Sequence, residues 1–173
     1  MTQRLAFPDH IFKAYDIRGV YPDELDEELA FSIGRAFATF LQQEKKRTDL
    51  SIVAAADMRV SSPQLKQHIV QGITKQGANV VDIGLASTPT FYFAVAEYNF
   101  DGGIIVSASH NPKDYNGCKM VRNHAIPISK ETGIFSIREL SRKNKFNSQT
   151  KMGKVIAKKQ VLSDQIKHAL THI

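Results

Sequence analysis

Cysteine is nearly absent from this chain, because Cys118 is the only one among 173 residues. A single thiol excludes an internal disulfide framework and fits a reducing compartment. No apolar run approaches the roughly 18 residues that a membrane-spanning helix needs. The N-terminal segment also lacks the apolar stretch of a secretory signal peptide. We therefore expect a cytoplasmic protein without a membrane partner.

Motifs that would identify several other classes of protein are missing as well. There is no Walker A or Gly-x-Gly-x-x-Gly loop for phosphate, and no Gly-x-Ser-x-Gly elbow of a serine hydrolase. The histidines show no metal-ligand spacing with cysteine or carboxylate residues; those considered are His10, His68, His124, His168 and His172. Cys118 follows Gly117 within a strand pattern, which favours a small buried side chain over a nucleophile.

Positive charge is in excess, with a formal net charge of +6 and a pI near 9.4. Basic proteins often bind nucleic acids or other polyanions. Here seven of the 23 Lys and Arg residues lie between Arg142 and Lys159, where Phe146 is the only aromatic residue. No platform for base stacking is evident in that stretch. We therefore expect a solvated face or linker and no nucleic-acid partner, with a nucleic-acid-binding tail at 142–159 as the alternative.

Helix and strand patterns alternate along the chain. Apolar residues recur every four positions from Leu25 to Leu41, which predicts an amphipathic helix. Ser62 and Thr88 each precede a proline, which predicts two more helices that begin with a hydroxyl cap. Further helices are expected over 130–142 and 161–173, and strands over 51–56, 79–83, 103–108 and 117–121. Such alternation predicts a layered α/β fold, and the short 114–116 connection suggests a hairpin within a mixed, mostly parallel sheet.

Composition turns polar between residues 144 and 154, which suggests the edge of a domain. We expect one α/β domain over residues 1–145, since a chain of this size buries roughly 70% of the surface that its unfolded form exposes. Residues 146–173 are expected to be a linker and the start of a second domain.

The chemistry is expected at the loop that directly follows strand 103–108. Ligands of open α/β sheets bind at the carboxyl ends of strands, and Ser109 lies there within Ser-Ala-Ser-His-Asn-Pro. Three cations lie close by in sequence: Lys113, Lys119 and Arg122. A hydroxyl among cations suits phosphate better than an acyl group, since acyl transfer needs a base and an oxyanion hole. An ordinary capped loop is the alternative.

Two further clusters contain charged residues. The guanidinium group of Arg18 has the forked geometry to bind a phosphate. The alternative is that Arg18 forms a salt bridge with Asp16 or Glu24. Asp57 and Arg59 lie in a strand-to-helix turn, where they order the turn or meet a neighbouring domain. For this second pair we favour the structural role over a catalytic one.

Together these segments resemble the α-D-phosphohexomutase family. Four of them match its motifs in order: the N-terminal signature at 12–19, the segment before the serine strand at 83–94, the active-site serine loop at 109–112 and its continuation at 114–119. One departure is that Ala55 and Ala56 replace the usual start of the strand-turn before Asp57 and Arg59. Intact members have four domains, and this chain resembles the first together with the approach to the second.

The resemblance implies a three-layer α/β/α sandwich. The segments 115–117 and 122–132 look most similar to bacterial phosphomannomutases, which implies interconversion of hexose 6-phosphate and hexose 1-phosphate, foremost of mannose. It further implies that Ser109 becomes phosphorylated and that a hexose 1,6-bisphosphate is the intermediate and activator. Lys119 and Arg18 are the catalytic residues expected beside Ser109. The residues expected to contact the substrate are Tyr15, His110 and Asn111.

The same resemblance implies Mg²⁺, bound by the phosphate on Ser109 and mainly by carboxylates of a missing domain. The expected partners are the phosphosugar substrate and the other domains of the same enzyme. The isolated chain is expected to show little or no mutase activity, because binding groups and metal ligands are spread over several domains. A phosphoglucosamine mutase domain is the alternative within the family, and a non-catalytic phosphosugar-binding module is the alternative outside it.

Overall fold

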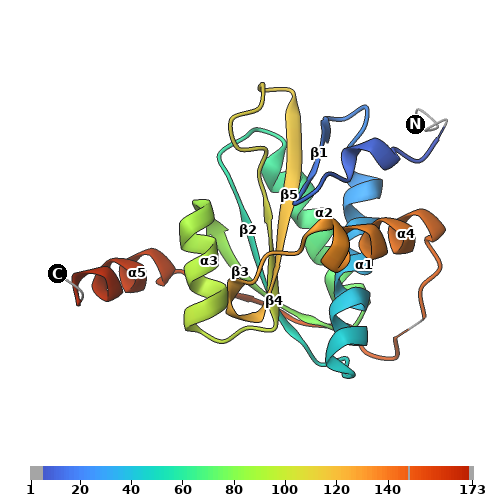
Figure 1. Ribbon diagram of the computed structural model, residues 1–173. Helices are drawn as coiled ribbons and strands as arrows, with labels where there is room; N and C mark the ends of the chain where they lie inside the picture. Colours follow the sequence, from blue (N-terminus) through green and yellow to red (C-terminus); the bar gives the residue numbers. More distant parts are fainter. Residues whose placement is uncertain (1–5, 148, 172–173) are drawn as a thin grey trace.

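The computed structural model describes residues 6–147 and 149–171 (Figure 1). Within these residues six strands form one sheet, in the order β1-β5-β4-β2-β3-β6. Their bounds are Ile17–Val20 (β1), Ser51–Ala56 (β2), Asn79–Leu85 (β3), Gly102–Val106 (β4), Tyr115–Arg122 (β5) and Val155–Ala157 (β6). All four strands predicted from the sequence are present, with ends shifted by at most two residues.

The sheet is mixed, as the short 114–116 connection predicts. Strands β4, β2, β3 and β6 run parallel to one another. Strand β5 returns antiparallel beside β4, and β1 pairs antiparallel with β5. The carboxyl ends of β2 and β4 therefore lie side by side at one edge of the sheet, which is where ligands of such sheets bind.

Helices cover both faces of the sheet, which confirms the three-layer sandwich. Helices α1 (Glu27–Lys45), α2 (Ser62–Lys75) and α4 (Phe135–Lys143) form one layer, in which α1 packs on the other two. Helix α3 (Thr88–Glu97) covers the other face and contacts α5 (Val161–Leu170), which projects at the left of Figure 1. Among the described residues, no helix combines the length and apolar character needed to cross a bilayer.

Each face of the sheet has its own apolar core. Ile52, Ala54 and Ala56 of β2 belong to the core under α1 and α2, whereas Val53 and Ala55 belong to the core under α3. This alternation follows from the two-residue period of a strand, and it explains why β2 is apolar at nearly every position.

Helices α1 and α2 touch through their backbones. A Cβ at Gly34 would lie 2.2 Å from the carbonyl oxygen of Ile69, and a Cβ at Gly72 would lie 2.2 Å from that of Phe31. Both distances are far below van der Waals contact, so glycine is required on each side. The close approach holds α2 tightly against α1.

Two predicted helix caps are wrong by one residue. Helix α2 has Ser61 at its N-cap, with no side-chain cap bond, and the hydroxyl of Ser62 donates instead to Asp57 at 2.5 Å. Helix α3 is capped by Ser87, whose Oγ accepts the N–H of Thr90. In both helices proline occupies the first turn as predicted, because proline lacks the N–H that would need a partner there.

Other differences concern short or irregular segments. Residues 130–142 divide into a wide turn at Lys130–Ile134 and helix α4. Strands β1 and β6 have no counterpart in the predicted elements. Strand β6 lies beyond residue 145 and still extends the sheet, and the assignment of 146–173 to a linker and second domain stays a prediction.

Candidate active site

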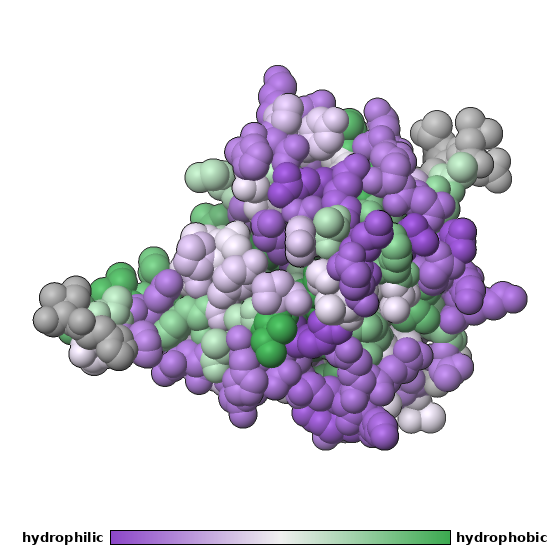
Figure 2. Space-filling view, viewed as in Figure 1, coloured by the Kyte–Doolittle hydropathy of each residue, from purple (hydrophilic) through white to green (hydrophobic). Residues whose placement is uncertain are grey.

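The candidate site lies on the connection between β4 and β5, at the top of Figure 1. Figure 2 shows mainly hydrophilic residues on the surface in this region. Ser107 and Ala108 are still buried, whereas Ser109 and His110 are exposed. The chain therefore leaves the core just before Ser109, and the hydroxyl is accessible from solvent.

The backbone at Ser109 has an uncommon conformation. Its φ is 54°, in the left-handed region that non-glycine residues rarely adopt. Its N–H donates to the Oγ of Ser107 at 3.2 Å, and its own Oγ lies 3.3 Å from Nδ1 of His110. Both the N–H and the side-chain amide of Asn111 donate to the carbonyl of Ala108, which closes a tight turn around Ser109.

Asp16 brings the two predicted cations together. Its carboxylate is only 9% exposed and accepts from Nε and Nη2 of Arg18, at 2.8 and 2.7 Å. The Nζ of Lys119 lies 3.3 Å from the same Oδ2 atom. Arg18 is thus paired with Asp16 and not with Glu24, the other partner that the sequence left open. This ion pair does not exclude phosphate binding, since an anion can compete with Asp16 for both cations.

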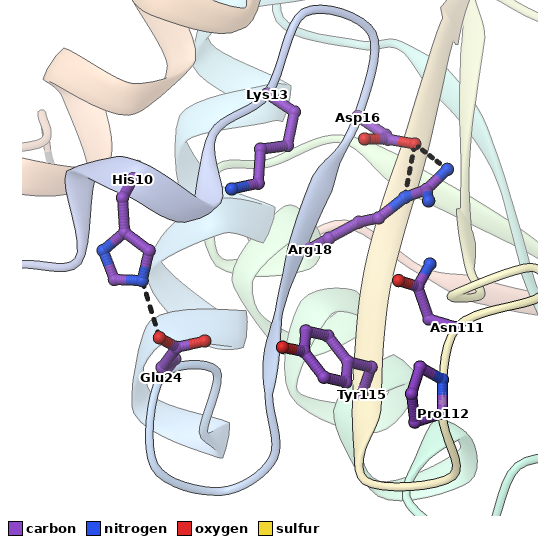
Figure 3. Close-up of a pocket in the computed structure, with 8 residues that line it drawn as sticks. All are labelled: His10, Lys13, Asp16, Arg18, Glu24, Asn111, Pro112 and Tyr115. Atoms are coloured by element: carbon purple, nitrogen blue, oxygen red, sulfur yellow. Dashed lines mark hydrogen bonds and ion pairs between the residues drawn. The ribbon is translucent and has the colours of Figure 1, made fainter.

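A cavity of about 520 Å³ opens beside the serine loop (Figure 3). Its lining residues are His10, Lys13, Asp16, Arg18, Glu24, Asn111, Pro112 and Tyr115. Figure 3 shows His10, Lys13 and Glu24 on one side of this space and Asn111 and Pro112 on the other. The N-terminal segment and the serine loop therefore form opposite walls of one polar cavity.

Glu24 connects two segments of the N-terminal wall of the cavity. It accepts the N–H of Val20 at 2.8 Å and contacts His10 at 2.6 Å. The Val20 N–H, followed by the contact with His10, lowers the pKa of Glu24 below its ordinary value. The glutamate therefore stays ionised and keeps His10 at the cavity entrance.

Not every predicted residue lies in this cavity. Tyr15 is 68% exposed and absent from the lining residues, and Tyr115 lines the cavity instead. His110 is exposed on the serine loop itself. The roles expected for Ser109, Lys119, Arg18, Tyr15, His110 and Asn111 stay predictions. Arg18 and Asn111 line the same cavity, and Lys119 shares the carboxylate of Asp16 with Arg18.

Arg122 does not join the cations around Ser109. It pairs with Gly102, where β4 begins, whereas Ser109 follows the end of β4. Its guanidinium binds the carboxylate of Glu44 and the carbonyl of Thr132. Arg122 lies three residues after Lys119 in β5, which places it roughly 10 Å further along the strand, because a strand rises about 3.4 Å per residue. Closeness in sequence was therefore misleading here.

Cys118 is confirmed as a small buried side chain. It has 1% of its surface exposed and belongs to the core under α1. Burial, followed by the negative charge of Asp16, raises its pKa to about 12. A thiol with such a pKa is protonated at neutral pH and is a poor nucleophile.

Sequence reasoning missed several cavity residues. From the sequence, His10 was considered only as a metal ligand, and Glu24 only as a possible partner of Arg18. Lys13 falls within the signature at 12–19, which was the one signal that pointed to it. No group of three or more His, Cys, Asp or Glu residues in the described part of the chain is arranged to hold a metal ion.

Comparison with known proteins gives a consistent result. A family model described as phosphoglucomutase/phosphomannomutase, α/β/α domain I, matches residues 9–148. The phosphomannomutase of Vibrio cholerae is 43% identical over 162 residues, which are 94% of this chain and 35% of that protein. A phosphomannomutase of Klebsiella pneumoniae is 46% identical over 135 residues, covering 78% of this chain and 82% of that protein.

A solved structure extends the similarity to three dimensions. A phosphoglucomutase/phosphomannomutase family protein of Burkholderia thailandensis superposes with a TM-score of 0.79 at 35% identity, over 91% of this chain and 34% of that one. The chain thus spans about a third of the length of the Vibrio cholerae and Burkholderia thailandensis proteins.

Proposed function

This chain belongs to the phosphoglucomutase/phosphomannomutase family, whose α/β/α domain I it represents, and on that premise we propose that it is the serine-bearing domain of a phosphohexomutase. The proposed reaction interconverts hexose 6-phosphate and hexose 1-phosphate, with mannose as the sugar. The choice of mannose is supported by the relatives that are named phosphomannomutases.

The observation that carries the proposal is the position of Ser109. Its hydroxyl is exposed on a tight loop at the carboxyl end of β4, beside a polar cavity. Two cations, Arg18 and Lys119, share one buried carboxylate next to that cavity. A phosphoryl group carries two negative charges near neutral pH, so it needs such neighbours.

The proposed cycle has two transfers. The phosphoryl group of phosphorylated Ser109 passes to the free hydroxyl of a hexose monophosphate, and the Ser109 oxygen is left as a hydroxyl after taking up a proton. The resulting hexose 1,6-bisphosphate turns around and returns its other phosphoryl group to Ser109. The isomeric hexose monophosphate then leaves, so phosphate and protons balance over the cycle.

In this proposal Arg18 and Lys119 stabilise the charge that spreads over the phosphoryl oxygens during transfer. Asp16 holds the two cations together when no phosphate is bound. An incoming phosphoryl group then meets cations that are already positioned, which lowers the cost of reorganisation. Asn111 and His110 are proposed to shape the loop and contact the sugar phosphate.

We include Mg²⁺ in the proposal as a partner of the Ser109 phosphate. When bound, it would neutralise part of the phosphoryl charge, and carboxylates from outside this chain would supply its other ligands. A hexose 1,6-bisphosphate is the proposed activator, because it can phosphorylate Ser109. The other proposed partners are the remaining domains of the same enzyme, and the proposed location is the cytoplasm.

The test is a Ser109→Ala variant of the complete enzyme, with Ser136→Ala, at an exposed position of α4, as a matched control. We expect mannose 1-phosphate turnover to fall at least about 10³-fold in the first variant, since the covalent carrier is lost, and to stay unchanged in the control. Intact-mass measurement after incubation with hexose 1,6-bisphosphate should find one phosphoryl group on the parent and none on S109A.

Retained turnover by the Ser109→Ala variant would reject the assignment. Faster turnover of glucosamine phosphates than of mannose phosphates would favour a phosphoglucosamine mutase. Binding of a sugar phosphate without any phosphoserine would favour a non-catalytic binding module. The 173-residue chain alone is expected to show little or no turnover, because the proposed metal ligands lie outside it.

A further inference from the structure

Arg59 lies in the turn between β2 and α2 and reaches across to the serine loop. Its two terminal nitrogens donate four hydrogen bonds, and all four go to backbone carbonyls of that loop. Nη1 donates to Pro112 at 2.6 Å and Tyr115 at 2.9 Å, and Nη2 donates to Ser109 at 3.0 Å and Asn111 at 2.6 Å. One side chain therefore binds carbonyls from both ends of the loop.

The guanidinium also forms an ion pair with Asp57. Nε lies 3.6 Å from Oδ2 of Asp57. Asp57 is itself fixed, because its Oδ1 accepts the N–H of Arg59 at 3.1 Å and the hydroxyl of Ser62 at 2.5 Å. The Arg59 side chain is 15% exposed. With both terminal nitrogens bonded to loop carbonyls and little exposure, the fork of Arg59 is directed at the loop and not at a substrate phosphate.

The serine loop depends on such an external support. Ser109 has a left-handed backbone, a conformation that persists only when its surroundings hold it. Within the loop, the N–H of Asn111 donates to the carbonyl of Ala108 and the N–H of Tyr115 donates to that of Pro112. The carbonyls of Ser109 and Asn111 are bound by Arg59 instead. Without the guanidinium, these carbonyls would turn to water and the loop would lose its shape.

We propose that Arg59 is the positioning residue that holds the Ser109 loop in its reactive shape, acting through four backbone carbonyls and not through the substrate. This inference rests on the proposed function of Ser109 and goes beyond it, because it assigns the loop's geometry to a residue 50 positions away. It also explains why the site needs an arginine. A lysine has one nitrogen on a flexible stem and cannot reach four carbonyls in a fixed fork.

A second contact allows the proposal to be tested without unfolding the protein. Asn116, which is fully buried in β5, donates from Nδ2 to the hydroxyls of Ser61 and Ser62 at 2.8 and 2.9 Å. This contact joins the turn before α2 to the sheet independently of Arg59. Removal of the guanidinium is therefore expected to loosen the loop and leave the two cores intact.

The first experiment measures amide hydrogen exchange in this chain. Arg59→Lys is compared with Arg47→Lys, since Arg47 also makes several hydrogen bonds, to Asp49 and Asp101. We expect exchange at residues 108–115 to accelerate at least about tenfold in R59K and not in R47K, with the protection of β4 and α1 unchanged in both. Equal exchange in the two variants would overturn the proposal. So would global unfolding of R59K, because the role would then be general stability.

The second experiment measures turnover in the complete enzyme. We expect R59K to lower kcat by about 10²-fold with KM for the sugar phosphate within about threefold, since misplacement of the reacting group affects the transition state more than binding. Added guanidinium ion should restore part of kcat in Arg59→Ala and none in Ser109→Ala. A rise in KM at constant kcat would instead make Arg59 a substrate ligand.

The two experiments separate this inference from the function on which it rests. If the parent enzyme turns over no hexose phosphate, the proposed function fails, and hydrogen exchange still decides whether Arg59 holds the loop. If the parent is active and R59K exchanges and reacts like R47K, the proposed function survives and the role of Arg59 is refuted.

Discussion

Gly117 is a position at which one added methyl group should disturb both stability and the candidate site. It lies in β5 opposite Arg18 of β1, and its carbonyl accepts the N–H of Ser107 at 2.9 Å. A Cβ built at Gly117 would lie 2.0 Å from the carbonyl oxygen of Ile17. That is about 1.4 Å short of the 3.4 Å at which ordinary contact begins. We therefore expect Gly117→Ala to push β1 away from β5.

The size of the effect follows from what must move. Overpacking costs about 1–3 kcal/mol, and the obstacle here is backbone, which yields less readily than a side chain, so the upper end applies. Alanine restricts the unfolded chain more than glycine does, which offsets about 0.5–1 kcal/mol. The net loss of unfolding free energy is thus about 2 kcal/mol. Displacement of β1 by about 1 Å also separates Arg18 from Lys119 and should lower kcat of the complete enzyme by about 10²-fold.

Gly19→Ala is the matched control in the same strand pair. A Cβ there would meet Cβ of Glu24 and Cγ2 of Ile11, both at 3.1 Å and both on side chains. Small side-chain shifts relieve such contacts, so the net change should stay below about 1 kcal/mol. Urea unfolding followed by far-ultraviolet circular dichroism measures both variants, since the chain has no tryptophan for fluorescence. If G117A unfolds within about 0.5 kcal/mol of the parent, the steric argument is refuted.

Two further predictions concern charge. Asp16→Asn keeps the shape of the side chain and removes its charge, which leaves Arg18 and Lys119 without their shared anion. We expect the free energy of unfolding, measured in urea, to fall by about 2 kcal/mol. An unchanged free energy of unfolding would contradict the ion-pair role of Asp16. A hydrogen bond to Glu27 raises the pKa of Tyr21 to about 12, and burial raises that of Tyr98 to about 12, from the ordinary 10.0. Both phenols stay protonated to a higher pH in the folded state than in the unfolded state. Their contribution to the free energy of unfolding is therefore complete below pH 10 and is lost as the pH rises from 10 towards 12. The urea midpoint of the parent should fall over that range, and that of the Tyr21→Phe/Tyr98→Phe double variant should fall less. Equal pH profiles of the two proteins would contradict this role of the two tyrosines.

The sequence determined most of the fold because its local signals are strong. The four-residue spacing from Leu25 to Leu41 and the two proline starts identify helices without any tertiary information. The buried strands β2 and β4 are recognisable from their continuous apolar runs. Strands β1 and β6 were missed because they have four and three residues, and β6 is exposed throughout. Their formation depends on pairing with β5 and β3, which a local pattern does not contain.

For the candidate site, the sequence by itself placed Ser109 at the end of a buried strand, and that position depends only on local pattern. The tertiary structure decided which charged residues surround it. The register of β1 on β5 brings Asp16 to Lys119 across 103 residues, and the adjacency of β2 and β4 brings Arg59 to the serine loop. Strand rise carries Arg122 away although it is close in sequence. Charges interact through space, so only the pairing of strands could select their partners.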